Sequence, residues 1–416
     1  LPNLEDMGDV RRLSERLLAG ETTTETEHPF NPKLLLEELG PRSAFFSGFA
    51  NVGVLDTDEG LVLVDTGSWL LAQASYEKIR AWSTREVKIA IFTHGHIDHV
   101  MGLGPFEDEA EREGRPRIEV VANEAMPARF ERYRRMQGYN SCINSRQFGI
   151  PIEWPSSYRE PDRLFRGTTF LEVGGLMIEL HTARGETDDH AWAYLPERRI
   201  LFTGDLFIWA SPNAGNPQKV QRYPLEWAQA LREMEALGAE VLSPGHGPPI
   251  WGKEAVRRAL SETADLLEFL VRETLDRMNA GMTLDQILHE VKAPGHLLAR
   301  PYLRPVYDEP SFLVRNIWRL YGGWYDGNPS RLLPAPDAAV ARELASLAGG
   351  ASRLANRAME LLPQDSALAA HLVEQAWLAS PEDTRIKEAR RAVYRQRVAE
   401  ATSLMAKGIF RAVAEE

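Results

Sequence analysis

Short apolar runs bounded by turn residues dominate the middle of the chain. Val87–Phe92 is almost wholly apolar and has the length of a buried strand, and Leu61–Asp65 follows an Asp- and Gly-containing turn that predicts a hairpin. Apolar residues at helical spacing occupy Leu70–Trp82 and Glu226–Leu237. Strands and helices interleaved in this way predict an α/β domain with layered, mixed sheets. The predicted strands are Gly48–Leu55, Leu61–Asp65, Val87–Phe92, Arg117–Ala122, Thr168–Val173, Leu176–Thr182, Ala191–Leu195, Ile200–Thr203 and Glu240–Ser243.

The pattern changes on both sides of this α/β region, which we expect to cover residues 45–255. Residues 1–44 are polar and irregular, and we expect them to form an N-terminal arm. Beyond residue 255 helix-forming residues dominate, so residues 256–416 are expected to form an all-α domain. The turns at 362–365 and 380–383 contain Pro and Asp and predict helix starts, and hairpins of tetratricopeptide type are one alternative there. The other predicted helices are Glu254–Met278, Thr283–Val291 and Ser311–Leu320.

Composition narrows the function classes. The 416 residues include 48 Lys and Arg against 60 Asp and Glu, a net charge of −12 that argues against a general nucleic-acid binder. The single cysteine, Cys142, excludes an intramolecular disulfide and a cysteine-rich zinc site. No apolar run is long enough to span a membrane. The N-terminus has no signal-peptide pattern, although trimming would hide one, so the compartment stays open with the cytoplasm favoured.

The clearest chemical signal follows the apolar run Val87–Phe92. There, Thr93-His94-Gly95-His96-Ile97-Asp98-His99 contains three imidazoles and one carboxylate. Histidine nitrogen and carboxylate oxygen are ligands that zinc and similar divalent ions prefer. For any one of these histidines, a packed or surface residue without a ligand is the competing explanation. For the four residues together, in the spacing HxHxDH after a strand, a metal site is favoured.

Three further candidates lie at the ends of later predicted strands. Glu186, Asp205 and His246 each follow a predicted strand, and each has a neighbouring glycine that lets the backbone approach a metal. Taken singly, they are explained as a solvated loop acid, a helix cap and a turn histidine. Taken with the HxHxDH cluster, their order and placement predict enough ligands for two metals.

The motifs His94-x-His96-x-Asp98-His99, Thr-Gly-Asp205 and Pro-Gly-His246 resemble those of the metallo-β-lactamase-fold hydrolases. Val64-Asp65-Thr66-Gly67 also matches that family, in which this Asp supports the site from behind the ligands. The resemblance implies an α/β fold, an αββα sandwich with one or two metals between its sheets, followed here by the all-α C-terminal domain.

One departure from the usual motifs indicates a branch of the family. Where such hydrolases usually have a Pro-Gly-His loop, this chain has Arg184-Gly185-Glu186, which is similar to the alkyl sulfatase branch. The stretch Tyr307–Pro329 is similar to that branch's dimerisation domain, and 138–149 resembles another of its segments. A homodimer built partly by residues 255–330 is therefore implied. A second departure is Gly204-Asp205, because sulfatases of this branch have a Glu there, in Ala-Glu-Asn.

The resemblance also implies the ligand sets of two Zn²⁺ ions per chain, with other divalent metals as alternatives. One ion would take His94, His96 and Glu186, the other would take Asp98, His99 and His246, and Asp205 would bridge them. Two such ions share a hydroxide that acts as the nucleophile. Asp98 is therefore counted as catalytic as well as a ligand.

The remaining site candidates rest on weaker signals. Asn144 and Arg146 lie in the sulfatase-like segment, where a guanidinium can bind an anion through two hydrogen bonds, and a structural Arg on a helix is the alternative. Lys219 and Arg222 follow the Asp205 loop and are further substrate-binding candidates, against solvated loop residues. The candidate proton donors to a leaving group are His190 and Tyr139, against packed residues without that role.

Two function classes remain in view. The first is a dinuclear metallohydrolase for a small anionic ester, with sulfate esters ahead of carboxylic esters, lactones and phosphoesters. The second is a redox protein or a scaffold that keeps the metal-binding fold. The complete set of ligands favours the hydrolase.

Overall fold

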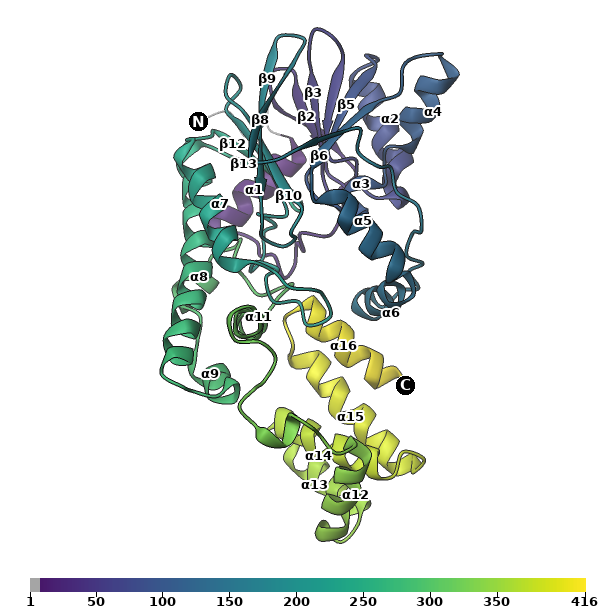
Figure 1. The fold of residues 1–416 in the computed structure, drawn as a ribbon, viewed down its shortest axis with the longest axis vertical. Helices are drawn as coiled ribbons and strands as arrows, with labels where there is room; N and C mark the ends of the chain where they lie inside the picture. The colour runs from purple at the N-terminus through teal and green to yellow at the C-terminus, as the bar shows by residue number, and fades with distance from the viewer. Residues whose placement is uncertain (1–7) are drawn as a thin grey trace. The chain divides into compact units, whose positions relative to one another are not determined.

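Two β-sheets lie face to face in the α/β part of the chain, and helices cover their outer sides (Figure 1). The structure is a computed structural model that describes residues 8–416, so the first part of the predicted N-terminal arm lies outside the described residues. Each sheet buries one face against the other sheet and one against helices. This arrangement confirms the predicted αββα sandwich.

Both sheets are mixed, as the sequence predicts. One contains, in spatial order, β1 (Leu36–Gly40), β2 (Ser43–Phe46), β3 (Val52–Asp56), β4 (Leu61–Val64), β5 (Val87–Phe92), β6 (Glu119–Asn123) and β7 (Arg163–Phe165). The other contains β13 (Ile250–Trp251), β12 (Val241–Pro244), β11 (Ile200–Gly204), β10 (His190–Leu195), β9 (Leu176–Ala183) and β8 (Thr168–Val173). Strands β4 to β7 run parallel, as do β11 and β12, and the other neighbours described are antiparallel.

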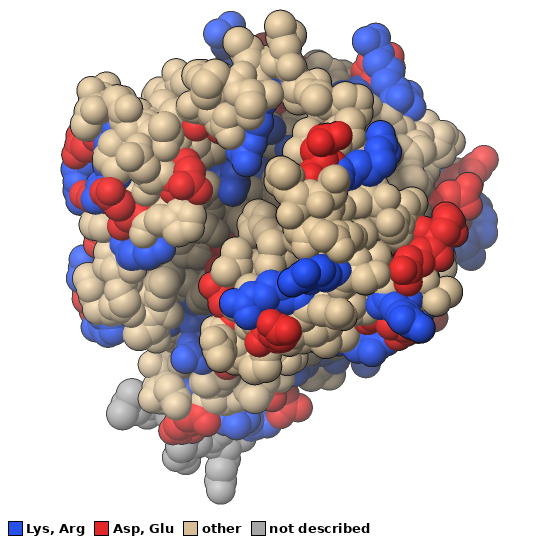
Figure 2. Space-filling view, turned by 90° about the horizontal axis from the view of Figure 1, so that it is seen from below, with Lys and Arg blue, Asp and Glu red and all other residues tan. Residues whose placement is uncertain are grey.

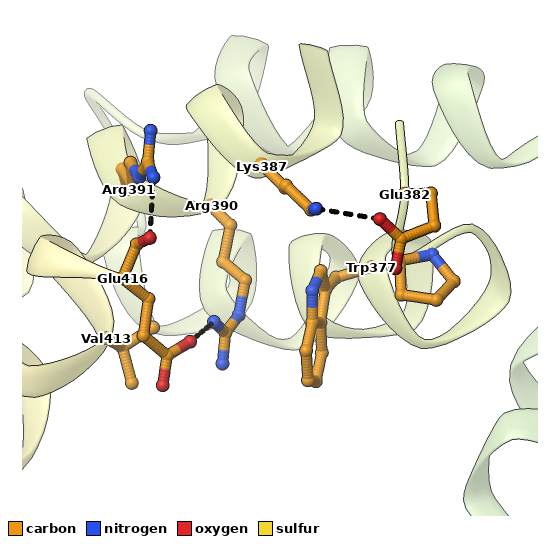
Figure 3. Close-up of a pocket in the computed structure, with 8 residues that line it drawn as sticks. Trp377, Glu382, Lys387, Arg390, Arg391, Val413 and Glu416 are labelled. Carbon is orange, nitrogen blue, oxygen red and sulfur yellow. Dashed lines mark hydrogen bonds and ion pairs between the residues drawn. The ribbon is translucent and has the colours of Figure 1, made fainter. Parts of the chain in front are cut away.

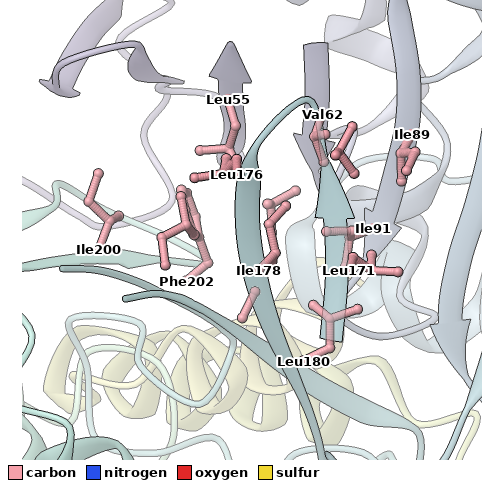
Figure 4. Close-up of a cluster of buried hydrophobic side chains, with 14 of the residues drawn as sticks. Leu55, Val62, Ile89, Ile91, Leu171, Leu176, Ile178, Leu180, Ile200 and Phe202 are labelled. Atoms are coloured by element: carbon pink, nitrogen blue, oxygen red, sulfur yellow. The ribbon is translucent and has the colours of Figure 1, made fainter. Parts of the chain in front are cut away.

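The hydrophobic core lies between the two sheets (Figure 4). Leu55, Val62 and Ile91 of the first sheet face Ile178 and Phe202 of the second, and all five are buried. A Cβ on Gly53 would lie 2.4 Å from the Phe202 ring, so only a glycine lets that ring pack flat on β3. The core fixes the distance between the sheets and thereby the positions of the loops at their ends.

The outer layers of the sandwich are helical. Helix α2 packs on β2 and on α4, while α1, α7 and α8 contact strands of the second sheet (Figure 1). The helices from the N-terminus to the start of the C-terminal region are α1 (Asp9–Ala19), η2 (Trp69–Leu71), α2 (Ala72–Trp82), α3 (Ile97–Val100), α4 (Gly104–Arg112), α5 (Met126–Arg135), α6 (Gln137–Phe148), α7 (Pro224–Ala236), α8 (Lys253–Asn279), α9 (Leu284–Glu290), α10 (Gly295–Leu298) and α11 (Pro310–Gly322).

The described residues form two compact units. The first contains residues up to 137, 155–280 and 287–321, and the second contains 138–154, 281–286 and 322–416. The boundaries that we expected at residues 45 and 256 stay a prediction, and the compact units divide the chain elsewhere. The described part of the expected arm joins the first unit, because α1 packs on β13 and β1 is part of the first sheet.

The second unit is helical, as the sequence predicts for this region. It contains η3 (Pro329–Arg331), α12 (Asp337–Ala348), α13 (Ala351–Leu361), α14 (Ser366–Ala379), α15 (Thr384–Glu400) and α16 (Leu404–Glu415), which pack as successive hairpins. Asp365 and Asp383 accept the backbone N–H groups of Leu368 and Arg385, so each caps a helix. The two predicted helix starts at these turns are confirmed.

A cavity of about 300 Å³ lies beside Trp377 in the second unit (Figure 3). The Arg390 guanidinium lies 4.0 Å from the centre of the Trp377 ring and pairs with Glu374 and Glu416. Arg391 donates to the main-chain oxygen of Glu416 at 2.6 Å. Because these cations already have partners within the unit, we assign this cavity no ligand.

Charges of both signs are interspersed on the surface. Figure 2 shows Lys and Arg side chains next to Asp and Glu on the face that it draws, with no broad area of one sign there. Among the described residues, none of the helices combines the length and the apolar character that crossing a bilayer requires.

Candidate metal centre

The loop after β5 carries four of the predicted ligands. His94 and His96 lie on the loop itself, and Asp98 and His99 lie in the short helix α3. The Nε2 of His94 lies 2.8 Å from the Nδ1 of His96, and the Nε2 of His99 lies 3.7 Å from an oxygen of Asp98. The HxHxDH spacing therefore brings four potential ligand atoms to one end of the sandwich.

The three strand-end candidates meet this loop. The Asp205 carboxylate lies between the imidazoles, with Oδ2 3.7 Å from Nε2 of His94 and Oδ1 3.2 Å from Nε2 of His99. The same Oδ1 lies 3.4 Å from Nε2 of His246, and Glu186 Oε2 lies 3.9 Å from Nδ1 of His96. The seven residues form two groups with converging ligand atoms, one of His94, His96, Glu186 and Asp205 and one of Asp98, His99 and His246.

The donor atoms fit divalent metals. His99 Nε2, Glu186 Oε2 and Asp205 Oδ1 are buried and have no hydrogen-bond partner among the described residues. Leaving a buried polar atom without a partner is costly unless something else binds it. Imidazole nitrogens and carboxylate oxygens in this number are the donors that zinc prefers. The two groups therefore have the donor chemistry of divalent-metal binding.

Neighbouring groups fix which nitrogen each imidazole presents. Asp65 accepts from Nδ1 of His99 at 2.7 Å, and it also accepts the backbone N–H of Thr93 at 2.7 Å. The hydroxyl of Thr93 lies 3.0 Å from Nδ1 of His94, and Nδ1 of His246 contacts the main-chain oxygen of Phe49. In each case Nε2 is left for the metal, which is the usual effect of a hydrogen bond behind a histidine ligand.

Asp65 adopts a strained backbone conformation with φ of 57°. Non-glycine residues in this region are uncommon, and they persist where the surroundings demand them. The positive φ of Asp65 is required by its contacts, because the turn after β4 brings its carboxylate to both Thr93 and His99. This placement agrees with the supporting role that the family resemblance implies.

The charges of the centre suit a cation. Burial and the neighbouring imidazoles hold the pKa of His94 well below 6.5, and burial and Arg129 do the same for the pKa of His96. Both rings are therefore neutral near pH 7, as ligands must be. Burial raises the pKa of Asp205, but His246 and His99 outweigh it, so the pKa of this carboxylate stays well below 3.8.

Glu186 is clamped by two side chains of one loop. Its Oε1 forms an ion pair with Arg222 Nη1 at 2.5 Å and accepts from the Nδ2 of Asn213, while Oε2 faces His96. Glu186 and Arg222 are both 3% exposed, so they form a buried ion pair. Burial still keeps the pKa of Glu186 well above 4.5. Arg222 thus offsets the negative charge that Glu186 adds to the centre.

A second buried pair supports the HxHxDH loop. Asp189 accepts the backbone N–H of Gly95 at 2.9 Å and pairs with Arg129 at 2.6 Å. Gly95 is necessary there, because a Cβ would lie 2.9 Å from both Arg129 and Asp189. The sequence analysis missed Arg129 and Asp189, and their only signal is proximity to Glu186 and His190 along the chain.

His190, a predicted proton donor, is fully buried at the start of β10. Its ring stacks on His94 with centroids 4.7 Å apart and planes 14° apart. Burial lowers the pKa of His190 to about 4, so the ring is neutral. Proton donation by His190 stays a prediction, and its observed position is that of a packing partner of His94.

The other predicted site residues lie in two places. Lys219 and Arg222 are in the first unit, where Lys219 is partly buried and burial lowers its pKa to about 7. Tyr139, Asn144 and Arg146 lie on α6, in the second unit. There, Tyr139 and Arg146 are exposed and Asn144 is buried, with its amide donating to the main-chain oxygen of Asn140 at 2.8 Å. The roles of these three residues stay predictions.

The aromatic residues Phe30 and Tyr307 also border the centre. The Phe30 ring meets His246 edge-on at 4.3 Å and Tyr307 at 4.4 Å. Burial and the nearby charge of Glu186 raise the pKa of Tyr307 well above 10, so its hydroxyl keeps its proton. The sequence analysis missed both residues. Tyr307 opens the stretch that resembles the dimerisation domain, and that resemblance indicates assembly rather than a metal site.

Known proteins share this combination of fold and motifs. The sequence profile of the metallo-beta-lactamase superfamily matches residues 47–246, which include all seven ligand candidates. Residues 47–246 therefore match the metallo-beta-lactamase superfamily. The profile of the alkyl sulfatase dimerisation domain matches residues 283–416, so this region is alkyl sulfatase-like. The predicted family and branch are confirmed.

Two of the relatives to which the chain is similar are alkylsulfatases. The chain is 28% identical over 325 residues to a linear primary-alkylsulfatase from Pseudomonas sp. (strain ATCC 19151), covering 72% of this chain and 61% of the relative. It is 29% identical over 329 residues to an (R)-specific secondary-alkylsulfatase from Pseudomonas sp., covering 73% of this chain and 50% of that relative. The chain thus spans between half and two thirds of the length of these relatives.

A solved structure has the same fold. The stereoselective inverting sec-alkylsulfatase from Pseudomonas sp. superposes with a TM-score of 0.82 and 24% identity, over 92% of this chain and 65% of the other. The similarity therefore extends through both the sandwich and the helical region.

Proposed function

We propose that this protein is a metal-dependent ester hydrolase whose preferred substrates are sulfate monoesters. The observation that carries the proposal is the set of seven ligand candidates with converging donor atoms, three of which are buried without a hydrogen-bond partner among the described residues. A non-catalytic scaffold has no need to keep every ligand. The similarity to primary and secondary alkylsulfatases supports sulfate ahead of carboxylic or phosphoric esters.

The centre would hold two divalent metal ions, with zinc favoured by the four imidazole ligands. His94, His96 and Glu186 would hold one ion, Asp98, His99 and His246 the other, and Asp205 both. Two bound ions supply Lewis acidity and lower the pKa of a bound water to about 7. The protein itself keeps the rings of His94 and His96 neutral. It orients His99 through Asp65 and His94 through Thr93, and it offsets the charge of Glu186 with Arg222.

A panel of esters tests this proposal directly. Purified protein loaded with zinc is assayed on chromogenic sulfate, carboxylate and phosphate monoesters, and its metal content is measured in parallel. We expect about two zinc ions per chain and the highest kcat/KM on a sulfate ester. Two iron ions with visible absorbance would indicate a redox protein instead, and turnover confined to carboxylate or phosphate esters would overturn the sulfatase proposal.

An anionic substrate needs cationic partners besides the metals, because the centre already contains three carboxylates. Lys219 is our candidate in the first unit. Burial and the neighbouring charge of Arg222 lower its pKa to about 7. Its positive charge is therefore present below pH 7 and is lost as the pH rises above 7. Anion binding that uses Lys219 should weaken over the same range.

We accordingly expect KM for a sulfate ester to rise several-fold between pH 6 and 8.5, up to about 10-fold, equivalent to about 1.4 kcal/mol. Lys219→Met should remove this pH dependence, while exposed Lys253→Met should keep it. Steady-state kinetics on a sulfate ester and on a neutral lactone provide the measurement. A KM whose pH dependence is the same in wild type and in Lys219→Met would exclude Lys219 as an anion ligand.

The chain should form a homodimer, which the match to a dimerisation domain supports. Part of the region 255–330 that we expected at the interface is used within the chain, since Leu313 and Ile317 are buried in the first unit. The second unit has an exposed apolar face. Val340, Leu344 and Leu347 form an exposed stripe along α12, with Leu347 85% exposed. Such an apolar stripe is typical of a covered face.

Placing a charge in that stripe should separate the subunits. We expect Leu344→Glu/Leu347→Glu to raise the Kd of dimerisation about 100-fold or more, because a carboxylate would be buried without a partner. Ser346→Glu, at an exposed position on the same helix away from the stripe, is the matched control. Sedimentation equilibrium measures both. A wild-type chain that stays monomeric at micromolar concentration contradicts the homodimer, and an unchanged dimer in the double variant contradicts this face.

A further inference from the structure

The loop from Ser211 to Tyr223 determines how Glu186 is oriented. It contains neither helix nor strand, yet it contributes both Asn213, which donates to Oε1 of Glu186, and Arg222, which forms an ion pair with the same oxygen. The other oxygen of Glu186 is thereby left to point at His96 and the metal group. A loop without internal secondary structure can only do this if something outside it fixes its path.

The segment 304–319 fixes that path at several points. The Ser211 N–H donates to the main-chain oxygen of Arg304 at 2.9 Å, and the Gly215 N–H donates to Asp308 Oδ2 at 2.7 Å. At the far end of the loop, the Asn316 amide donates to the main-chain oxygen of Arg222 at 3.0 Å. Asn213 lies between the first two anchors, and Arg222 is itself the third.

Gly215 shows how closely the loop is pressed against this segment. A Cβ at this position would lie 2.3 Å from the backbone nitrogen of Leu313 and 2.3 Å from the backbone carbon of Phe312. Backbone atoms at the start of α11 cannot move aside as a flexible side chain could. Glycine is therefore required here for close approach of two backbones.

Asp308 is fully buried, and both of its oxygens act as acceptors. Oδ2 accepts from Gly215, and Oδ1 accepts the backbone N–H of Glu309 at 2.8 Å. Burial raises the pKa of Asp308 to about 7, although these hydrogen bonds oppose the rise. Asparagine has the same shape but only one acceptor oxygen, so it cannot satisfy both N–H groups.

We propose that Asp308 and Asn316 are positioning residues that act through the Ser211–Tyr223 loop to aim Glu186 at the metals. The inference rests on the proposed metal-dependent function. Both residues lie within the range that matches the alkyl sulfatase dimerisation profile, 283–416. Within that range, residues 287–321 belong to the first unit and serve the metal centre rather than assembly alone.

The test compares zinc affinity in Asp308→Asn and wild type, using chelator-stripped protein titrated with zinc against a competing chelator. Removing a residue that orients a ligand typically costs about 10- to 100-fold in metal affinity. We expect a loss of this size for one of the two zinc ions, with dimerisation unchanged. Asn316→Leu, which removes the anchor at Arg222, should act in the same direction, and exposed Arg315→Ala is the matched control.

A double-variant comparison with Glu186 shows whether Asp308 acts by positioning Glu186 or by supporting the structure in general. In a Glu186→Gln background, Asp308→Asn should cause little further loss of zinc affinity, because both changes then disturb the same ligand. Equal losses in the two backgrounds would overturn the inference, as would wild-type zinc affinity in both Asp308→Asn and Asn316→Leu. If Asp308→Asn does not fold, Asn316→Leu decides the question. Failure of the proposed function is distinct, since wild-type protein would then bind no zinc or hydrolyse no ester.

Discussion

Replacing Asp205 by asparagine is expected to lower kcat/KM on the preferred ester at least about 1,000-fold, a loss of roughly 4 kcal/mol of transition-state stabilisation. The physical reason is its central position. One oxygen lies 3.2 Å from His99 and 3.4 Å from His246, and the other lies 3.7 Å from His94. Asparagine keeps this shape but loses the negative charge and one acceptor oxygen, so the group of His94, His96, Glu186 and Asp205 loses a carboxylate and the proposed bridge to the other group is weakened.

Metal analysis and steady-state kinetics measured on the same sample check this expectation. We expect the zinc content to fall below that of wild type while the circular dichroism spectrum is unchanged, because Asp205 follows β11 and lies outside the apolar core. Exposed Asp276→Asn, on α8, is the control and should keep both metal and activity. An Asp205→Asn enzyme with full metal content and full activity would remove Asp205 from the centre.

Replacing Arg222 by methionine is expected to destabilise the zinc-free protein by about 3–5 kcal/mol, the usual cost of removing one partner from a buried ion pair. Glu186 would then be a carboxylate that is 3% exposed, with Asn213 as its remaining donor in this clamp. Zinc should reduce the loss, because a cation bound to Glu186 compensates the same charge.

The dependence on pH has a definite sign. Burial already holds the pKa of Glu186 above its ordinary value, and removing Arg222 takes away a charge that lowers it. In the variant, the folded protein then binds this proton more tightly than the unfolded chain does. Its stability should therefore fall further as the pH rises through the range between the unfolded and folded pKa values.

Urea unfolding of zinc-free protein, followed by tryptophan fluorescence at several pH values, measures this loss. The double variant Arg222→Met/Glu186→Gln should recover much of the stability, since it removes both buried charges. Arg199→Met breaks an exposed ion pair with Glu240 and should have little effect. A double variant no more stable than Arg222→Met would mean that the loss comes from packing rather than from charge.

The predicted strands and the metal ligands were accessible from local pattern. Val87–Phe92 and Thr168–Val173 form strands with the predicted bounds. The first is an apolar run buried between layers, and the second buries Leu171 and Val173 in the alternation of a half-exposed strand. The ligands could be found because each follows a strand, and strand ends of one sandwich meet at a common edge. The HxHxDH motif places four ligand candidates within six consecutive residues, His94–His99, and packing alone does not require such a cluster.

Other elements were missed although the sequence contains their signal. Val10, Leu13 and Leu17 have helical spacing and are buried on one face of α1. The polar residues between them weaken this apolar pattern in the sequence. The Glu37 side chain that accepts the N–H of Val10 comes from a distant part of the chain, so no local pattern indicates it. The expected strand at Gly48–Leu55 begins only at Val52, because Asn51 instead donates to main-chain oxygens beside His246.

The sequence by itself predicted a layered α/β domain with mixed sheets, the helical C-terminal region and the seven ligand candidates, since these depend on residue type and on spacing along the chain; the αββα arrangement came from the family resemblance. Only the tertiary structure decided what surrounds Glu186. Arg222 looked like a solvated loop residue and is a buried partner, and Asp308 looked like part of a dimerisation segment and anchors the loop that carries Asn213. These contacts join residues about 30 to 90 positions apart, and their energies come from burial, which no local pattern records.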